Sequence, residues 1–151
     1  MTPFSGPLMT VYDALASALL GGDYWRVVAP FTYIIKPGIH VTVPAGYLTD
    51  GASVPKVFWN IIPPWGKYGQ AAVVHDLLCE YLSVVQNGVP ITISRAYCDS
   101  VLNEAMEALG VPTAKRLMIY WSVSAYRMTI GTTKPNPNPL KQRLESEWKG
   151  V

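Results

Sequence analysis

Apolar residues recur at helical spacing in three stretches of the second half of the chain, over residues 71–82, 95–109 and about 112–128. Ser94 is placed to cap the second of these stretches, and Gly110 is placed to end it. Proline at position 112 is acceptable as the first residue of a helix. The pattern predicts three helices, and the short connections between them favour neighbouring helices that pack together.

Residues 24–43 carry a different pattern, rich in aromatic and β-branched side chains. Residues 36–38, Lys-Pro-Gly, supply a turn in the middle, so this segment predicts an antiparallel β-hairpin or small sheet. Residues 10–20 predict a short amphipathic helix, and residues 56–62 predict another. Residues 86–90 have the composition of a loop between the first two long helices.

These elements predict an α+β fold, in which a small antiparallel β-hairpin or sheet is followed by a three-helix core containing a helix hairpin. Residues 1–130 form one globular domain in this interpretation. Residues 131–151 form a C-terminal arm, in which proline alternates with asparagine before a short polar helix over 140–148. Leu144 and Trp148 are four residues apart on that helix. Because such a tail frays unless it is tied down, we expect a neighbouring subunit to hold it.

The composition limits the classes of function. The 151 residues are enough for one domain with its own core. Half of the residues are apolar and only 15% are charged, which predicts a covered face in an oligomer, an assembly or a lipid interface. A net charge of +2 with scattered Lys and Arg excludes a nucleic-acid footprint. No apolar run reaches the roughly 18 residues of a membrane span, and the start lacks a signal-peptide pattern. We therefore expect a product that stays in the cytoplasm where it is made.

The two cysteines, Cys79 and Cys98, do not form a disulfide framework or a CxxC motif. They predict free thiols. A disulfide between them stays open as an alternative if the first two helices pack with those faces together.

His75 and Asp76 are adjacent ionisable residues inside an otherwise apolar helix, and their side chains project about 100° apart. Imidazole titrates near neutrality and a carboxylate is a hard ligand, so the pair suits a general base beside a metal-binding or orienting group. It equally suits a buried histidine satisfied by hydrogen bonds. Asp99, one turn into the second helix, lies opposite His75 if the helices form a hairpin. The alternative is a solvated carboxylate favoured by the helix dipole.

The loop over residues 43–55 is dense in residues with special backbone geometry. Asp50 and Gly51 can turn the chain tightly, so that carbonyl groups, the Asp50 carboxylate and the Ser53 hydroxyl point into a shared space. The other interpretation is an ordinary turn, with Ser53 as the cap of a helix that begins at Pro55. A serine hydrolase that uses Ser53 with His75 is disfavoured, because the serine is not in a GxSxG elbow.

Three segments resemble an uncharacterised family found largely in tailed bacteriophages and prophages. They are Tyr47-Leu-Thr-Asp-Gly-Ala-Ser-Val-Pro55, Tyr68-Gly-Gln-Ala-Ala-Val-Val-His-Asp76, and Arg95-Ala-Tyr-Cys-Asp99 with Glu104-Ala-Met106 and Gly110-Val-Pro112. The resemblance covers about residues 40–125. It implies a phage origin, and hence synthesis in the host cytoplasm with or without later association with the virion, but it implies no chemistry.

A second resemblance does carry chemistry. Residues 71–81, followed by a helix bearing Asp99, look like the core of the secreted phospholipase A2 superfamily, particularly its disulfide-poor version in parvovirus capsid proteins. The resemblance implies that His75 activates water, that Asp99 fixes the other imidazole nitrogen, and that Asp76 binds Ca²⁺. The remaining calcium ligands would come from the preceding loop, at Leu48, Asp50 and Gly51. That loop departs from the glycine-rich phospholipase pattern.

Two functions follow as expectations. The first is a calcium-dependent hydrolase of lipids or other esters, whose partner would be a lipid or membrane surface. The second is a non-enzymatic virion structural or assembly protein, whose partners would be phage structural proteins or a second copy, bound through the C-terminal arm. Neither function involves nucleic acid.

Overall fold

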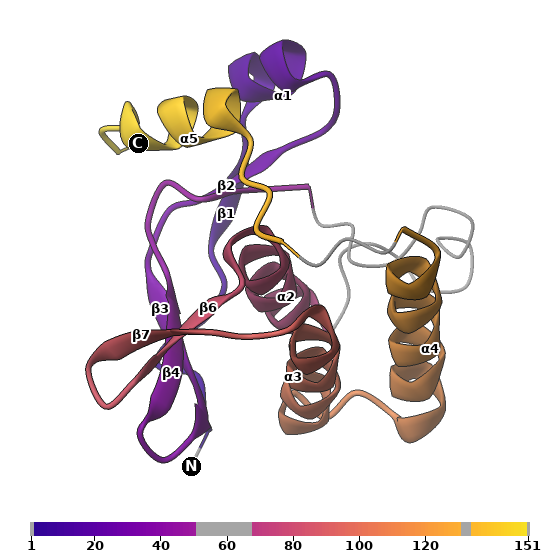
Figure 1. Ribbon diagram of the computed structural model, residues 1–151. Helices are drawn as coiled ribbons and strands as arrows, with labels where there is room; N and C mark the ends of the chain where they lie inside the picture. The colour runs from indigo at the N-terminus through magenta and orange to yellow at the C-terminus, as the bar shows by residue number, and fades with distance from the viewer. Residues whose placement is uncertain (1, 51–67, 131–133, 151) are drawn as a thin grey trace.

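The computed structural model describes residues 2–50, 68–130 and 134–150. Within these ranges it contains two small antiparallel sheets and helices α1 to α5, so the expected α+β fold class is confirmed. The larger sheet lies on one side of α2, and α3 and α4 follow on the other side (Figure 1). The helix expected over 56–62 lies outside the described residues, as do Gly51 and Ser53.

The larger sheet has the strand order β3-β4-β6-β7, formed by β3 (Phe31–Lys36), β4 (Ile39–Val43), β6 (Ser83–Gln86) and β7 (Val89–Thr92). The hairpin expected from the aromatic stretch is confirmed as β3 and β4. The expectation of a plain loop over 86–90 is wrong, because this segment is the turn between β6 and β7 and the start of β7. Its turn residues, Asn-Gly at 87 and 88, both have positive φ, as a type I′ hairpin turn requires.

The smaller sheet has the order β1-β2-β5, formed by β1 (Thr10–Tyr12), β2 (Trp25–Val27) and β5 (Leu48–Thr49). The helix expected over 10–20 is therefore partly wrong: three residues pair as a strand, and α1 (Ala14–Leu20) begins only after Asp13. The Asp13 carboxylate accepts a hydrogen bond from the Ala16 amide at 2.9 Å, which caps the helix.

Helices α2 (Gly69–Tyr81), α3 (Arg95–Ala108) and α4 (Thr113–Ile130) match the three expected helices within a few residues. Helix α2 is buried on most sides, because it packs against both β4 and α3, and α3 in turn packs against α4. Hydrogen-bonding groups on α2 must therefore find partners inside the protein. In the described part of the chain, no helix is both long enough and apolar enough to cross a bilayer.

The C-terminal arm folds back on its own chain, where α5 (Pro139–Ser146) lies against α1 (Figure 1). The Lys141 ammonium group lies 2.8 Å from the Glu80 carboxylate of α2. The Leu48 amide donates a hydrogen bond to the Glu145 carboxylate at 2.8 Å. These contacts explain the order of the arm within one chain, so the neighbouring subunit that we expected is not needed to hold it.

Candidate functional site

His75 and Asp99 meet across the interface between α2 and α3. The Nε2 atom of His75 lies 2.7 Å from Oδ1 of Asp99, and the two residues are only 5% and 1% exposed. The expectation that Asp99 lies opposite His75 is confirmed, and the alternative of a solvated carboxylate is wrong. A buried carboxylate needs partners for its charge, and the imidazole is one of them.

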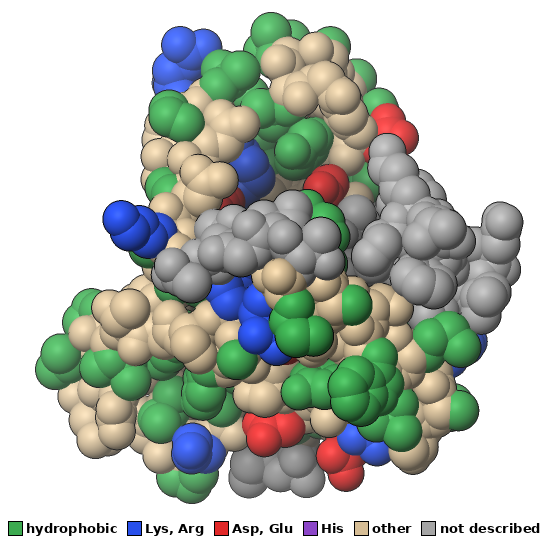
Figure 2. All heavy atoms as spheres, turned by 45° about the vertical axis from the view of Figure 1, so that its right-hand side comes forward, with side chains coloured by type: hydrophobic (Ala, Val, Ile, Leu, Met, Phe, Trp, Pro, Cys, Tyr) green, Lys and Arg blue, Asp and Glu red, His purple; other side chains and the backbone are tan. Residues whose placement is uncertain are grey.

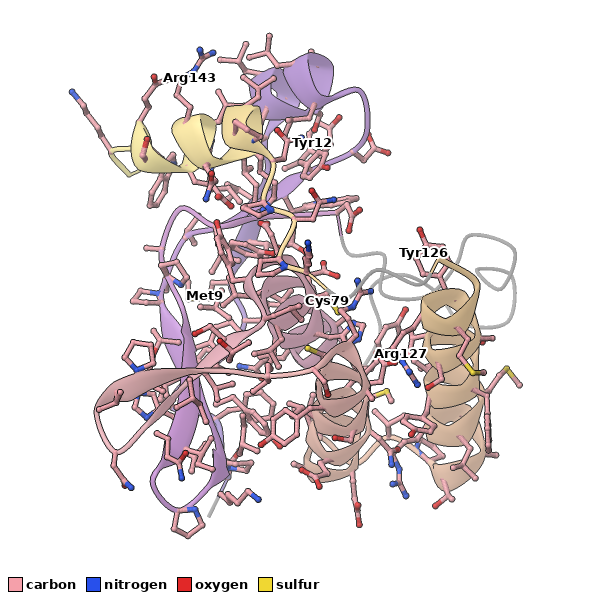
Figure 3. All side chains as sticks on the ribbon, viewed as in Figure 1. Met9, Tyr12, Cys79, Tyr126, Arg127 and Arg143 are labelled. Carbon is pink, nitrogen blue, oxygen red and sulfur yellow. The ribbon has the colours of Figure 1, made fainter. Side chains whose placement is uncertain are left out.

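Arg127, on α4, is the second partner of Asp99. Its Nε donates a hydrogen bond to Asp99 Oδ2 at 2.8 Å, and its side chain reaches into the space between α4 and α3 (Figure 3). The sequence reasoning missed this residue. The available signal was a single arginine in the otherwise uncharged second half of an amphipathic helix. Asp99 is therefore held between an imidazole and a guanidinium group, each on its own carboxylate oxygen.

The charges of this cluster support one another. Burial by itself lowers the pKa of His75, but the adjacent Cys79 sulfur and the Asp99 carboxylate raise that pKa to about 10. Burial raises the pKa of Asp99, whereas its hydrogen bonds and charge interactions with His75 and Arg127 outweigh burial and lower it. At neutral pH, the cluster is thus an imidazolium, a carboxylate and a guanidinium.

Cys79 lies one turn along α2 from His75, with its Sγ 3.4 Å from His75 Nε2. A hydrogen bond with Cys98 and burial both raise the pKa of the Cys79 thiol, so it keeps its proton. Both cysteines are free thiols, as expected. Cys79 and Asp99 approach the same imidazole nitrogen, whereas a catalytic triad places nucleophile and carboxylate on opposite nitrogens. The geometry therefore does not describe a cysteine nucleophile.

A cavity of about 530 Å³ opens in front of this cluster. His75 and Cys79 line it from α2. Three of the four expected calcium ligands also line it, namely Leu48, Asp50 and Asp76. The fourth, Gly51, lies outside the described residues. Asp99 sits behind His75 and does not line the cavity, which suits a residue that orients the imidazole.

The donors on the cavity wall fit a hard cation. Asp50 and Asp76 both line the cavity, and the Thr49 hydroxyl donates a hydrogen bond to Asp76 Oδ2 at 2.7 Å, which orients that carboxylate. Oxygen ligands of this kind are those that Ca²⁺ prefers. Leu48 belongs to β5 and its side chain is fully buried. Because that side chain has no oxygen atom, Leu48 would contribute only its backbone carbonyl.

Two basic residues, Lys141 and Arg95, line the same cavity and differ in their ion pairing. Lys141 is neutralised by Glu80 and Glu145, at 2.8 and 3.0 Å. Arg95, at the start of α3, has a buried Nε that finds no hydrogen-bond partner among the described residues. No ion pair joins Arg95 to a carboxylate of the described residues, and a guanidinium group of this kind on the wall of a cavity can bind an anion. The sequence reasoning did not single out Arg95.

The C-terminal arm completes the wall with Asn136, Asn138 and Lys141. The Asn136 amide donates to the Glu80 carbonyl at 3.0 Å, which ties the arm to α2 beside the cavity. These residues were missed because their place depends on the docking of α5.

Residues 25–123 of this chain match a family described as protein of unknown function, DUF1353. The match covers most of the chain and includes α2 and α3, so the chain belongs to this family. The chain is 35% identical over 126 residues to the "Uncharacterized protein y4jT" of Sinorhizobium fredii (strain NBRC 101917 / NGR234). That alignment covers 81% of this chain but 33% of the relative, so the chain spans about a third of the relative's length. No solved structure matches the chain.

Proposed function

We propose that this chain is a calcium-dependent hydrolase of lipids or other esters, with His75 as its base. The observation that carries the proposal is the 2.7 Å contact between His75 Nε2 and Asp99, in the wall of a cavity that also receives the Asp76 carboxylate. A histidine oriented by a buried carboxylate beside a hard-cation site is the arrangement that water activation on an ester requires.

The roles of the two nitrogens follow from the hydrogen bonds. With Nε2–H donated to Asp99, Nδ1 is the atom that accepts a proton from water. Arg127 keeps Asp99 ionised, so Asp99 stabilises the imidazolium that forms when the proton is accepted. Asp99 and Arg127 are positioning residues in this scheme, because neither touches the substrate.

Asp76 and Asp50 would hold the cation, with the carbonyl of Leu48 as a further oxygen donor. When bound, Ca²⁺ polarises an ester carbonyl and stabilises the developing oxyanion. A positive charge beside His75 also opposes the influence of Asp99 on the pKa of the imidazole. The proposal therefore ties the base function of His75 near neutral pH to occupation of the cation site.

Arg95 favours a substrate that carries a negative charge, such as the phosphate of a lipid headgroup.

The tailed-phage or prophage origin that the motifs imply is part of the proposal, and it places synthesis in a bacterial host.

The proposal is tested by ester cleavage on anionic phospholipid vesicles with and without Ca²⁺. We expect cleavage by the wild type that is lost in His75→Gln and in Asp76→Asn, with calorimetric calcium binding abolished only in the latter. His40→Gln is the matched control, because His40 is the other histidine and lies on β4 outside the cavity. Cleavage that persists in a folded His75→Gln protein would refute the base function.

A second candidate function, a virion structural or assembly component, is favoured by the surface of α4. Leu117, Trp121 and Met128 on this helix are 43%, 66% and 70% exposed. Figure 2, which turns this side forward, shows hydrophobic side chains lying open among polar ones. An apolar helix face of this kind suits a contact with a structural protein or a second copy. Mass spectrometry of purified particles tests this candidate, and absence of the chain from them would contradict it.

A further inference from the structure

We propose that His75, Cys79 and Asp99 form a binding site for a thiophilic divalent metal ion such as Zn²⁺, separate in its donors from the oxygen site at Asp50 and Asp76. The ligand atoms are His75 Nε2, Cys79 Sγ and one carboxylate oxygen of Asp99, and they all lie within 4.8 Å of one another.

The distances between the donors suit a shared ion. His75 Nε2 lies 2.7 Å from Asp99 Oδ1 and 3.4 Å from Cys79 Sγ. Zinc binds nitrogen and oxygen at about 2.0–2.2 Å and sulfur at about 2.3 Å, so donors around one tetrahedral ion are separated by about 3–4 Å. Small side-chain adjustments therefore bring all three donors onto one ion.

The scaffold already orients the three ligands. His75 and Cys79 are four residues apart on α2 and share one face of the helix. Asp99 comes from α3, and Arg127 holds its Oδ2, which leaves Oδ1 on the side of the other donors. Metal-ligating residues commonly rely on such outer contacts for their orientation. His75 and Cys79 both line the cavity, so a fourth position would face it.

The donor chemistry decides between metals. Thiolate and imidazole select zinc and similar ions, whereas calcium takes oxygen ligands. The carboxylates of Asp50 and Asp76 lie on the same cavity but bring no sulfur or nitrogen. The softer donors His75 and Cys79 thus line the same cavity as the hard donors Asp50 and Asp76, as two separate sets.

Binding of the metal releases two protons. The thiol proton of Cys79 and the proton on His75 Nε2 leave to solvent, and the metal takes both lone pairs. The imidazole keeps its proton on Nδ1, so this nitrogen becomes a donor that no longer accepts a proton from water. If His75 is the base of the proposed hydrolase, a thiophilic metal therefore inhibits it; this consequence rests on the proposed function, whereas the metal site does not.

The test is titration of the full-length protein with Zn²⁺ and with Co²⁺, followed by calorimetry and absorption. We expect one ion per chain and a cobalt–thiolate absorption band in the near ultraviolet. The band should disappear in Cys79→Ser and persist in Cys98→Ser, the matched control. Loss of the outer contact in Arg127→Gln should weaken zinc binding by about 10- to 100-fold.

A measurement on the wild type keeps the test independent of how the variants fold. In weakly buffered solution, zinc binding to the wild type should release about two protons per ion, from the Cys79 thiol and from His75, which a pH indicator reads. Absence of zinc binding, a thiolate band that survives in Cys79→Ser, or zinc binding without proton release would each overturn the metal site. None of these readouts uses ester cleavage, so failure of the proposed hydrolase would leave them unaffected.

Discussion

Asp99 accepts one hydrogen bond on each of its carboxylate oxygens. His75 donates to Oδ1 at 2.7 Å, and Arg127 donates to Oδ2 at 2.8 Å. The pairing of His75 with Asp99 joins α2 to α3 and fixes which imidazole nitrogen faces the carboxylate. Because the carboxylate is 1% exposed, its charge is sustained by these two partners and not by water.

Asp99→Asn should lower the pKa of His75 from its folded value of about 10. The neutral amide no longer favours the imidazolium, and burial by itself lowers the pKa. The free energy of unfolding should fall by on the order of 3 kcal/mol, because the buried imidazolium and the partly exposed guanidinium of Arg127 lose their counterion. The measurements are an NMR titration of the His75 ring protons and urea unfolding. Asp23→Asn, an exposed substitution, is the control, and an unchanged His75 pKa in Asp99→Asn would contradict the prediction.

The stability of the protein should fall as the pH rises from neutral towards 10. The pKa of His75 is raised in the folded state from 6.5 to about 10, so the charged imidazole contributes stability that is fully present below pH 6.5. That contribution is lost as the pH rises through the folded value. The difference in unfolding free energy between wild type and His75→Gln should therefore shrink between pH 7 and pH 10. A difference that stays constant across this range would show that His75 is not charged.

Arg95→Gln should weaken the binding of an anionic ligand in the cavity with little effect on stability, because the buried Nε of Arg95 has no hydrogen-bond partner among the described residues. In the ester-cleavage assay, the KM for anionic vesicles should rise by about tenfold or more, which corresponds to loss of one charge-assisted hydrogen bond. The KM for neutral vesicles should change little. Arg143→Gln, on the exposed side of α5, is the control. Equal effects on anionic and neutral vesicles would exclude anion binding by Arg95.

Lys141→Met should destabilise the protein by about 3–5 kcal/mol, because it leaves the Glu80 side chain, which is only 11% exposed, without its counterion. The Lys141 ammonium group also lies 4.1 Å from the centre of the Tyr47 ring, and this cation–π contact is lost as well. The measurement is urea unfolding, with the exposed Lys149→Met as the control. If both variants unfold alike, the arm does not stabilise the domain.

The helices could be predicted from the sequence because their signals are local. Apolar spacing placed α2, α3 and α4 within a few residues, and Ser94 caps α3 by accepting from the Tyr97 amide at 3.0 Å. The hairpin of β6 and β7 was missed, because four-residue strands, one with Pro90 in it, are stabilised by pairing with β4 and with each other. That hairpin still returns the chain towards α2, so the meeting of His75 with Asp99 was predicted correctly although the connection was not.

The sequence by itself determined the chemical types and the local framework: a histidine and a carboxylate side by side on a buried helix, and a second carboxylate at the start of the next. The tertiary structure alone decided which groups join them. Arg127 reaches Asp99 from 28 positions away, and Lys141 reaches Glu80 from 61 positions away. Hydrophobic periodicity predicts which face of α4 or α5 is buried, but it does not predict which other element that face packs against. Charge pairing across a core depends on the packing of whole elements, and no local pattern in the chain records that packing.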